Sequence, residues 1–192
     1  MEKTILTTII ITGPPGIGKT TLVRNICSNL QNKGHLIQGF YTEEVRNAGI
    51  GQRIGFDVVS LEGKRGILSR ENPPDQLRRP KVGRYSVFVH DFEDLILPLL
   101  NFKDCRPEPE LLVIDEVGKM ELLSKRFESA MGYVLKNKLP VVVTIPEKTS
   151  LPLVEQLKKT PGSVLFQVTK SNRNTLAAKI IDLITTSLLV TK

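Results

Sequence analysis

The sequence has few of the features that mark secreted, membrane or nucleic-acid-binding proteins. It has no tryptophan, only 5% of its 192 residues are aromatic, and it shows no signature of a nucleic-acid module. Its two cysteines, Cys27 and Cys105, have neither metal-ligand nor redox spacing. Its start is broken by threonines and lacks the apolar core of a secretory leader. No apolar run approaches the roughly 18 residues of a membrane span. The sequence therefore predicts a cytoplasmic protein that does not enter a membrane.

The charge is unbalanced but dispersed. A formal net charge of +7 favours anionic ligands, and the phosphates of a nucleotide are one such ligand. The basic residues are scattered along the chain, so nucleic acid stays a weakly supported alternative. The composition and length suit one domain over residues 1–192, and we expect it to be a monomer.

Apolar strands and amphipathic helices alternate along most of the chain. Residues 5–12 are β-branched and almost wholly apolar, as is typical of a strand buried on both faces of a parallel sheet. Further strands are predicted at 36–45, 111–115, 141–145 and 164–168, and helices at 21–33, 92–100, 125–136, 153–159 and 175–189. This alternation predicts a three-layer α/β sandwich with a mainly parallel sheet.

The middle third has a different pattern. Two strand-like runs at 53–60 and 84–89 are separated by turn-rich segments that contain glycine or proline. We interpret residues 46–89, approximately, as antiparallel hairpins inserted into the α/β domain.

A glycine-rich loop joins the first predicted strand to the first predicted helix. It matches the phosphate-loop pattern G-x-x-x-x-G-K-[ST] without exception. Its residues are Gly13, Pro14, Pro15, Gly16, Ile17, Gly18, Lys19 and Thr20. The pattern requires glycine because backbone N–H groups must approach a polyphosphate closely, and the following helix directs its N-terminus at the anion. The sequence therefore predicts a nucleoside-triphosphate site in a P-loop NTPase fold.

The last residues of this loop have separate predicted roles. Lys19 is expected to reach the β- and γ-phosphates and to act in catalysis. The hydroxyl of Thr20 is expected to bind Mg²⁺, and the backbone of Thr21 is expected to contact phosphate.

A second acidic site is predicted where an apolar strand ends in Asp115 and Glu116. Ligands of doubly wound sheets bind at the carboxyl ends of the strands, so both side chains should lie beside the phosphate loop. Asp115 is expected to hold the metal, and Glu116 to accept a proton from the attacking water or to align it. The alternative is that Asp115 caps a helix and Glu116 is solvated.

A third candidate segment follows the last predicted strand. Thr169, Lys170, Ser171 and Asn172 resemble the [NT]-K-x-D loop with which GTPases read guanine, with Asn172 in place of the aspartate. A carboxamide offers one acceptor where a carboxylate offers two, so broad base use is predicted. Asn172 and Arg173 are therefore candidate nucleotide contacts. The alternative is that Ser171 or Asn172 caps the last helix.

Charge that develops on the transferred phosphoryl group calls for a further cation. The candidates are arginines in loops or at hairpin edges, and the sequence leaves the choice among them open. They are Arg46, Arg53, Arg70, Arg84 and Arg173.

The assembled motifs resemble the THEP1 family of nucleoside-triphosphatases. Besides the phosphate loop, the resemblance depends on residues 39–46, 53–59, 68–70, 115–122 and 168–174, and it spans nearly the whole chain. It implies Mg²⁺-dependent conversion of a nucleoside triphosphate to the diphosphate and phosphate, with little base preference. Two other functions stay open. One is a nucleotide or nucleoside kinase, and the other is a regulatory nucleotide-binding module associated with RNA.

Overall fold

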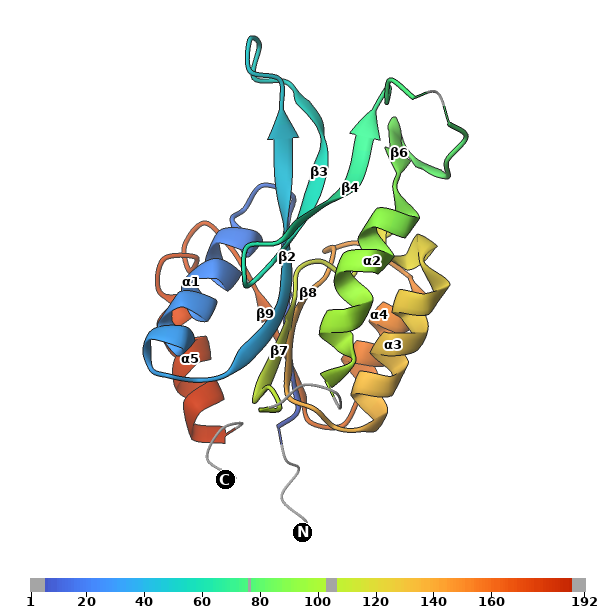
Figure 1. The fold of residues 1–192 in the computed structure, drawn as a ribbon. Coiled ribbons are helices and arrows are strands. Elements are labelled where there is room, and N and C mark those ends of the chain that lie inside the picture. The colour runs from blue at the N-terminus through green and yellow to red at the C-terminus, as the bar shows by residue number, and fades with distance from the viewer. Residues whose placement is uncertain (1–5, 76, 103–106, 188–192) are drawn as a thin grey trace.

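The computed structural model describes residues 6–75, 77–102 and 107–187. Cys105 and the predicted ends of the first strand and last helix, at residues 5 and 188–189, lie outside these ranges. Five parallel strands form the centre of the sheet (Figure 1). In spatial order they are β2 (Ile37–Arg46), β7 (Leu111–Ile114), β8 (Val141–Thr144), β1 (Thr8–Thr12) and β9 (Ser163–Gln167). Strand β8 thus separates β1 from β7.

Helices cover both faces of this sheet (Figure 1). One face packs against α1 (Lys19–Asn32) and α5 (Leu176–Ser187). The other packs against α2 (Val89–Leu100), α3 (Lys125–Lys136) and α4 (Pro152–Lys159). Strands β1, β7 and β8 are buried on both faces because each face has its own hydrophobic core. The predicted α/β fold with a parallel central sheet is confirmed.

The aromatic centre of the second core ties the sheet to two helices. Phe40 of β2 makes edge-to-face contacts with Phe92 of α2 and Phe127 of α3, at centroid distances of 5.9 and 6.1 Å. Phe92 and Phe127 also contact each other, at 5.3 Å. These three side chains are fully buried, so they fix β2 against α2 and α3 at the level where β2 leaves the parallel sheet.

Beyond Phe40, strand β2 continues upward into antiparallel strands (Figure 1). They are β3 (Arg53–Ser60), β4 (Arg65–Glu71), β6 (Tyr85–Val87) and the edge strand β5 (Lys81–Val82). We call residues 41–87 the antiparallel extension. The pairing of β2 with β3 begins at Phe40 and Ser60, several residues before the predicted start near residue 46.

Other differences between the observed and the predicted elements lie at α1, β6 and β4. Helix α1 begins at Lys19, inside the phosphate loop, because its first turn is part of that loop. The predicted end of the strand at 84–89 is wrong, since β6 stops at Val87 and α2 begins at Val89. Strand β4 was not predicted individually, because its buried residues Leu68 and Ser69 are adjacent and do not alternate. Among the described residues, no helix has the length and apolar character needed to cross a bilayer.

Candidate nucleotide-binding site

The phosphate loop leaves β1 and enters α1 through glycines in left-handed conformations. Gly16 and Gly18 have φ angles of +74° and +108°. A Cβ atom on either residue would have no packing neighbour within 4 Å, so packing does not demand glycine at these positions. The left-handed backbone conformation is what requires glycine at these two positions. The absence of side chains also leaves the space above the loop open to a ligand. No side chain caps the start of α1, so its first N–H groups are available to an anion.

Lys19 lies across its own loop. Its Nζ donates to the carbonyl of Gly13 at 2.9 Å and to that of Pro14 at 3.4 Å. Ile17 is buried and anchors the loop to the core. Among the described residues, Lys19 forms no ion pair with a carboxylate. Its charge is therefore available to a phosphate, and its contact with the β- and γ-phosphates stays a prediction.

Asp115 follows β7 and is almost completely buried. Its Oδ1 accepts a hydrogen bond from the Thr144 hydroxyl at the end of β8, while its Oδ2 has no partner among the described residues. Burial raises the pKa of the carboxyl. Thr144, Thr20, the Thr42 backbone and the charge of Lys19 oppose that rise. The structure thus brings Asp115 to the start of α1, with one buried oxygen unsatisfied.

Glu116 is the next residue and is half-buried. Burial raises the pKa of its carboxyl, the positive charge of Lys19 lowers it, and the Asp115 carboxylate adds to the rise. Val117 then donates its N–H to the carbonyl of Thr144 at 2.9 Å, which ties this segment to β8. The predicted pair of carboxylates therefore lies, like Lys19, at the carboxyl-terminal end of the parallel strands.

Glu121 belongs to this site and was not singled out from the sequence. It begins a short 3₁₀ helix, Glu121–Leu123, and its Oε2 accepts the N–H of Gly118 at 3.0 Å. The side chain is buried, and burial together with the nearby Glu116 raises its pKa to about 8. An acidic residue next to the apolar pair Leu122 and Leu123 is the only local signal, and it does not reveal the contact.

Known proteins are similar to this chain in both sequence and fold. A family model described as NTPase matches residues 8–181. The human protein named cancer-related nucleoside-triphosphatase is 42% identical over 186 residues, which cover 93% of this chain and 97% of the human one. The chain belongs to the THEP1 family of nucleoside-triphosphatases.

Solved structures of the THEP1 family agree with this assignment. The solution structure of a human cancer-related nucleoside triphosphatase superimposes with a TM-score of 0.79 at 43% identity, covering 94% of this chain and 98% of the human one. The crystal structure of THEP1 from Aquifex aeolicus gives 0.76 at 37% identity, covering 92% and 98%. The likeness extends over the antiparallel extension as well as the parallel sheet, since nearly all of each chain is covered.

In this THEP1-family chain, the loop after β9 uses Asn172 to hold itself together. The side-chain Oδ1 accepts the N–H of Thr169 at 2.8 Å, and Nδ2 donates to the carbonyl of Gln167 at 2.9 Å. Both ends of the carboxamide are thus engaged within the loop. The guanidinium of the next residue, Arg173, is exposed and bonds to none of the described residues.

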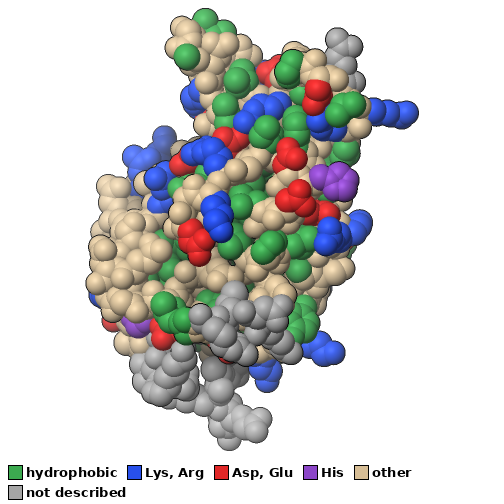
Figure 2. All heavy atoms as spheres, viewed as in Figure 1, with side chains coloured by type: hydrophobic (Ala, Val, Ile, Leu, Met, Phe, Trp, Pro, Cys, Tyr) green, Lys and Arg blue, Asp and Glu red, His purple; other side chains and the backbone are tan. Residues whose placement is uncertain are grey.

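The other candidate arginines are engaged in the antiparallel extension. Arg70 pairs with the buried Asp57, and Arg53 pairs with Glu44 at 2.8 Å. Arg46 also pairs with Glu44, and Arg84 lies 3.5 Å from Glu71. Figure 2 shows acidic and basic side chains interspersed over this face rather than gathered into a patch of one sign. None of these four guanidinium groups is free to approach a phosphate without losing a partner.

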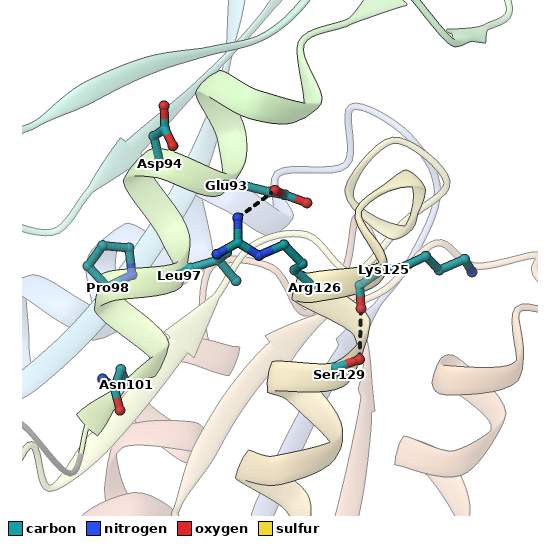
Figure 3. Close-up of a pocket in the computed structure, with 8 residues that line it drawn as sticks. All are labelled: Glu93, Asp94, Leu97, Pro98, Asn101, Lys125, Arg126 and Ser129. Carbon is teal, nitrogen blue, oxygen red and sulfur yellow. Dashed lines mark hydrogen bonds and ion pairs between the residues drawn. The ribbon is translucent and has the colours of Figure 1, made fainter.

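A surface groove of about 810 Å³ lies elsewhere, between α2 and α3 (Figure 3). Within it, Arg126 pairs with Glu93 at 3.1 Å, and Glu93 also accepts the hydroxyl of Ser124. The groove is lined by Glu93, Asp94, Leu97, Pro98, Asn101, Lys125, Arg126 and Ser129. It includes no residue of the phosphate loop and neither Asp115 nor Glu116, so it is separate from the candidate site.

Proposed function

We propose that the chain hydrolyses the terminal phosphoanhydride of nucleoside triphosphates, with water as the acceptor and Mg²⁺ as the cofactor. Its relatives are named nucleoside-triphosphatases at about 40% identity over nearly the full chain. The observation that carries the proposal is the position of an unpaired Lys19 and two carboxylates at one edge of the sheet. As a member of the family, the chain is a hydrolase of nucleoside triphosphates.

The phosphate loop supplies most of the binding groups. We propose that the backbone N–H groups from Gly16 to Thr21 hold the phosphates and that Lys19 neutralises the β- and γ-phosphates. The outer residues of the loop, Pro14 and Pro15, have no N–H group and serve to stiffen it. The uncapped start of α1 supports this proposal, because an anion would satisfy its free donors.

The metal would be held by the Thr20 hydroxyl and Asp115. The unpartnered Oδ2 of Asp115 is buried, and a buried carboxylate oxygen without a hydrogen bond is costly unless a cation or water satisfies it. Oxygen ligands are those that Mg²⁺ prefers, so the residues present fit this ion. When bound, Mg²⁺ would neutralise charge on the phosphates.

Glu116 is the proposed catalytic carboxylate. Its raised pKa makes it a better proton acceptor than an exposed glutamate, and Lys19 lies near enough for its charge to lower that pKa in part. Hydrolysis needs a positioned water and a group that orients it or takes its proton. Glu116 is the half-buried carboxylate next to Asp115 that can fill this role.

We propose broad base specificity. Reading guanine would require a free acceptor pair at position 172, and the Asn172 carboxamide is engaged within its own loop. Arg173 remains available to contact the nucleotide from the same loop. We also propose that residues 1–192 form one P-loop NTPase domain that acts as a monomer, with the extension as an inserted segment.

The test is to separate binding from turnover with Glu116→Gln. The variant should bind ATP and GTP with Mg²⁺ in calorimetry as the parent does, while phosphate release falls about 10²–10³-fold, as for the loss of a positioned catalytic group. Glu62→Gln, on an exposed side chain, is the matched control and should keep parental turnover. Parental turnover in Glu116→Gln would remove Glu116 from the mechanism.

The same assay separates hydrolysis from the other two functions. A kinase would pass the phosphate to an added nucleoside or nucleoside monophosphate, so phosphate release and labelled product would compete. A regulatory module would release no more phosphate than Glu116→Gln does. Release of one phosphate per nucleotide consumed, without any added acceptor, supports the hydrolase.

A further inference from the structure

Gly118 lies between two carboxyl groups. Its N–H donates to Oε2 of Glu121 at 3.0 Å. A Cβ atom built on Gly118 would lie 2.9 Å from Oε1 of Glu116 and 3.0 Å from Oε2 of Glu121. The two carboxyl groups therefore border the same point in space, and a side chain at position 118 would push one of them away.

The segment between the two glutamates is closed by further hydrogen bonds. Leu122 donates its N–H to the carbonyl of Gly118 at 3.1 Å, and Ser124 donates to that of Glu121 at 3.1 Å. The Ser124 side chain in turn caps α3 by accepting the N–H of Phe127 at 2.9 Å. Glu121 thus joins the Glu116 segment to the rigid start of a helix in the core.

We propose that Glu121, through its hydrogen bond to the Gly118 amide, is a positioning residue that holds the Glu116 carboxylate in its catalytic orientation. This inference rests on the proposed catalytic role of Glu116. Glu121 itself need not touch the nucleotide or the attacking water.

The protonation state of Glu121 affects how it positions Glu116. The charged groups that act on it are Glu116 and Asp115, both acidic, and burial is the largest cause of its raised pKa of about 8. At neutral pH the carboxyl is therefore mainly uncharged, and Glu121 adds no like charge beside the carboxylate of Glu116. Above pH 8 the Glu121 carboxylate would repel that of Glu116 across Gly118, so turnover should fall there.

The first arm of the test compares Glu121→Ala with Glu121→Gln. Alanine removes the acceptor for the Gly118 N–H, so kcat should fall about tenfold, the scale of one buried hydrogen bond, with KM changed less than twofold. Glutamine keeps an acceptor oxygen and cannot ionise, so it should restore kcat at pH 7 and abolish the fall above pH 8. Parental kcat in Glu121→Ala, or equal losses in both variants, would overturn the proposal.

Asp57→Ala is the matched control. Asp57 is nearly as buried as Glu121, at 7% against 5% exposure, but it pairs with Arg65 and Arg70 in the antiparallel extension. All three variants should be assayed well below their unfolding temperatures. If Asp57→Ala loses as much kcat as Glu121→Ala, the effect is a general loss of rigidity and the positioning role is refuted.

A second readout does not depend on activity. The amide resonance of Gly118 in a ¹⁵N-labelled sample should titrate with a midpoint near pH 8 in the parent and should not do so in Glu121→Gln. In a Glu116→Gln background, Glu121→Ala should cause no further loss of kcat. Parental turnover in Glu116→Gln alone would instead disprove the role of Glu116, and a full additional loss in the double variant would disprove only the coupling.

Discussion

Two regions of the molecule are rich in charge and use it in opposite ways. One is the phosphate-loop edge, where the carboxyl ends of the parallel strands bring together Lys19, Asp115 and Glu116. The other is the antiparallel extension. In the extension, Asp57 accepts from both Arg65 and Arg70, and Glu43 accepts from Arg24 and Arg65. Each of these cations has an anion beside it, and the resulting network is closed.

At the loop edge, the charged groups are left incomplete. Lys19 bonds only to backbone carbonyls among the described residues, and Asp115 keeps a buried oxygen without a partner there. Unsatisfied buried polar groups are costly, so a protein retains them where a ligand completes them. The comparison teaches that charge paired within the fold serves structure here, and that charge left without a partner marks the candidate site.

The largest expected effect is a loss of triphosphate binding at the phosphate-loop edge. Lys19→Ala should weaken the binding of a triphosphate with Mg²⁺ about 100-fold, because it removes a charge-assisted contact to phosphate. Isothermal calorimetry measures this directly. Lys64→Ala, on an exposed side chain, should leave the affinity unchanged. Undiminished affinity in Lys19→Ala would refute the phosphate-loop assignment.

In the antiparallel extension, Asp57→Ala should destabilise the fold without disabling the candidate site. The side chain of Asp57 is only 10% exposed, and its loss leaves Arg65 and Arg70 without their shared partner. We expect the free energy of unfolding to fall by about 2–4 kcal/mol, measured by urea denaturation. Turnover at 20 °C should stay within about twofold of the parent. A folded variant without turnover would make the extension part of the active site and break the comparison.

A smaller effect concerns the pH dependence of stability. Because the pKa of Glu121 is raised to about 8 in the folded chain, the native state binds more protons than the unfolded chain between about pH 4.5 and 8. Its contribution to stability is therefore present at low pH and is lost as pH rises through 8. Glu121→Gln should flatten this decline by about 1 kcal/mol or more between pH 5 and pH 8.5 in urea denaturation. Parallel curves would show that Glu121 does not titrate in this range.

The smallest expected effect is on base choice. Asn172→Asp cannot donate to the carbonyl of Gln167, so it should loosen the loop rather than create a guanine reader. The ratio of kcat/KM for GTP to that for ATP should stay within about twofold of the parent, which is less than about 0.5 kcal/mol. Asn174→Asp is the neighbouring control. A tenfold shift toward GTP would show that position 172 faces the base.

The sequence predicts the phosphate-loop edge better than it predicts the antiparallel extension. The phosphate loop is predicted from residue types alone, because a polyphosphate would require both its glycines and Lys19. Strands β1, β7 and β8 were predicted because their burial on both faces leaves continuous apolar runs. Asp115 was expected from its place at the end of such a run, and the structure brings it to the loop edge.

Features that depend on tertiary contacts were not predicted. Strand β4 has no alternating pattern, and the register of β3 shifts between Phe56 and Asp57 where the two strands pair. That shift decides which arginines reach Asp57, so the ion pairs could not be inferred from spacing. The importance of Glu121 depends on a backbone amide three residues earlier, and any acidic residue in a turn would look the same in the sequence.

The two edges of the sheet differ in a way that affects how the protein behaves at high concentration. Edge strand β5 has two residues, whereas edge strand β9 has five and exposes Val164 and Leu165 at 37% and 48%. A long edge with apolar side chains can pair with the same edge of another copy, and like net charge is what keeps such copies apart. With a net charge of +7, solubility should therefore be greatest in dilute salt and should decline as ions screen that repulsion.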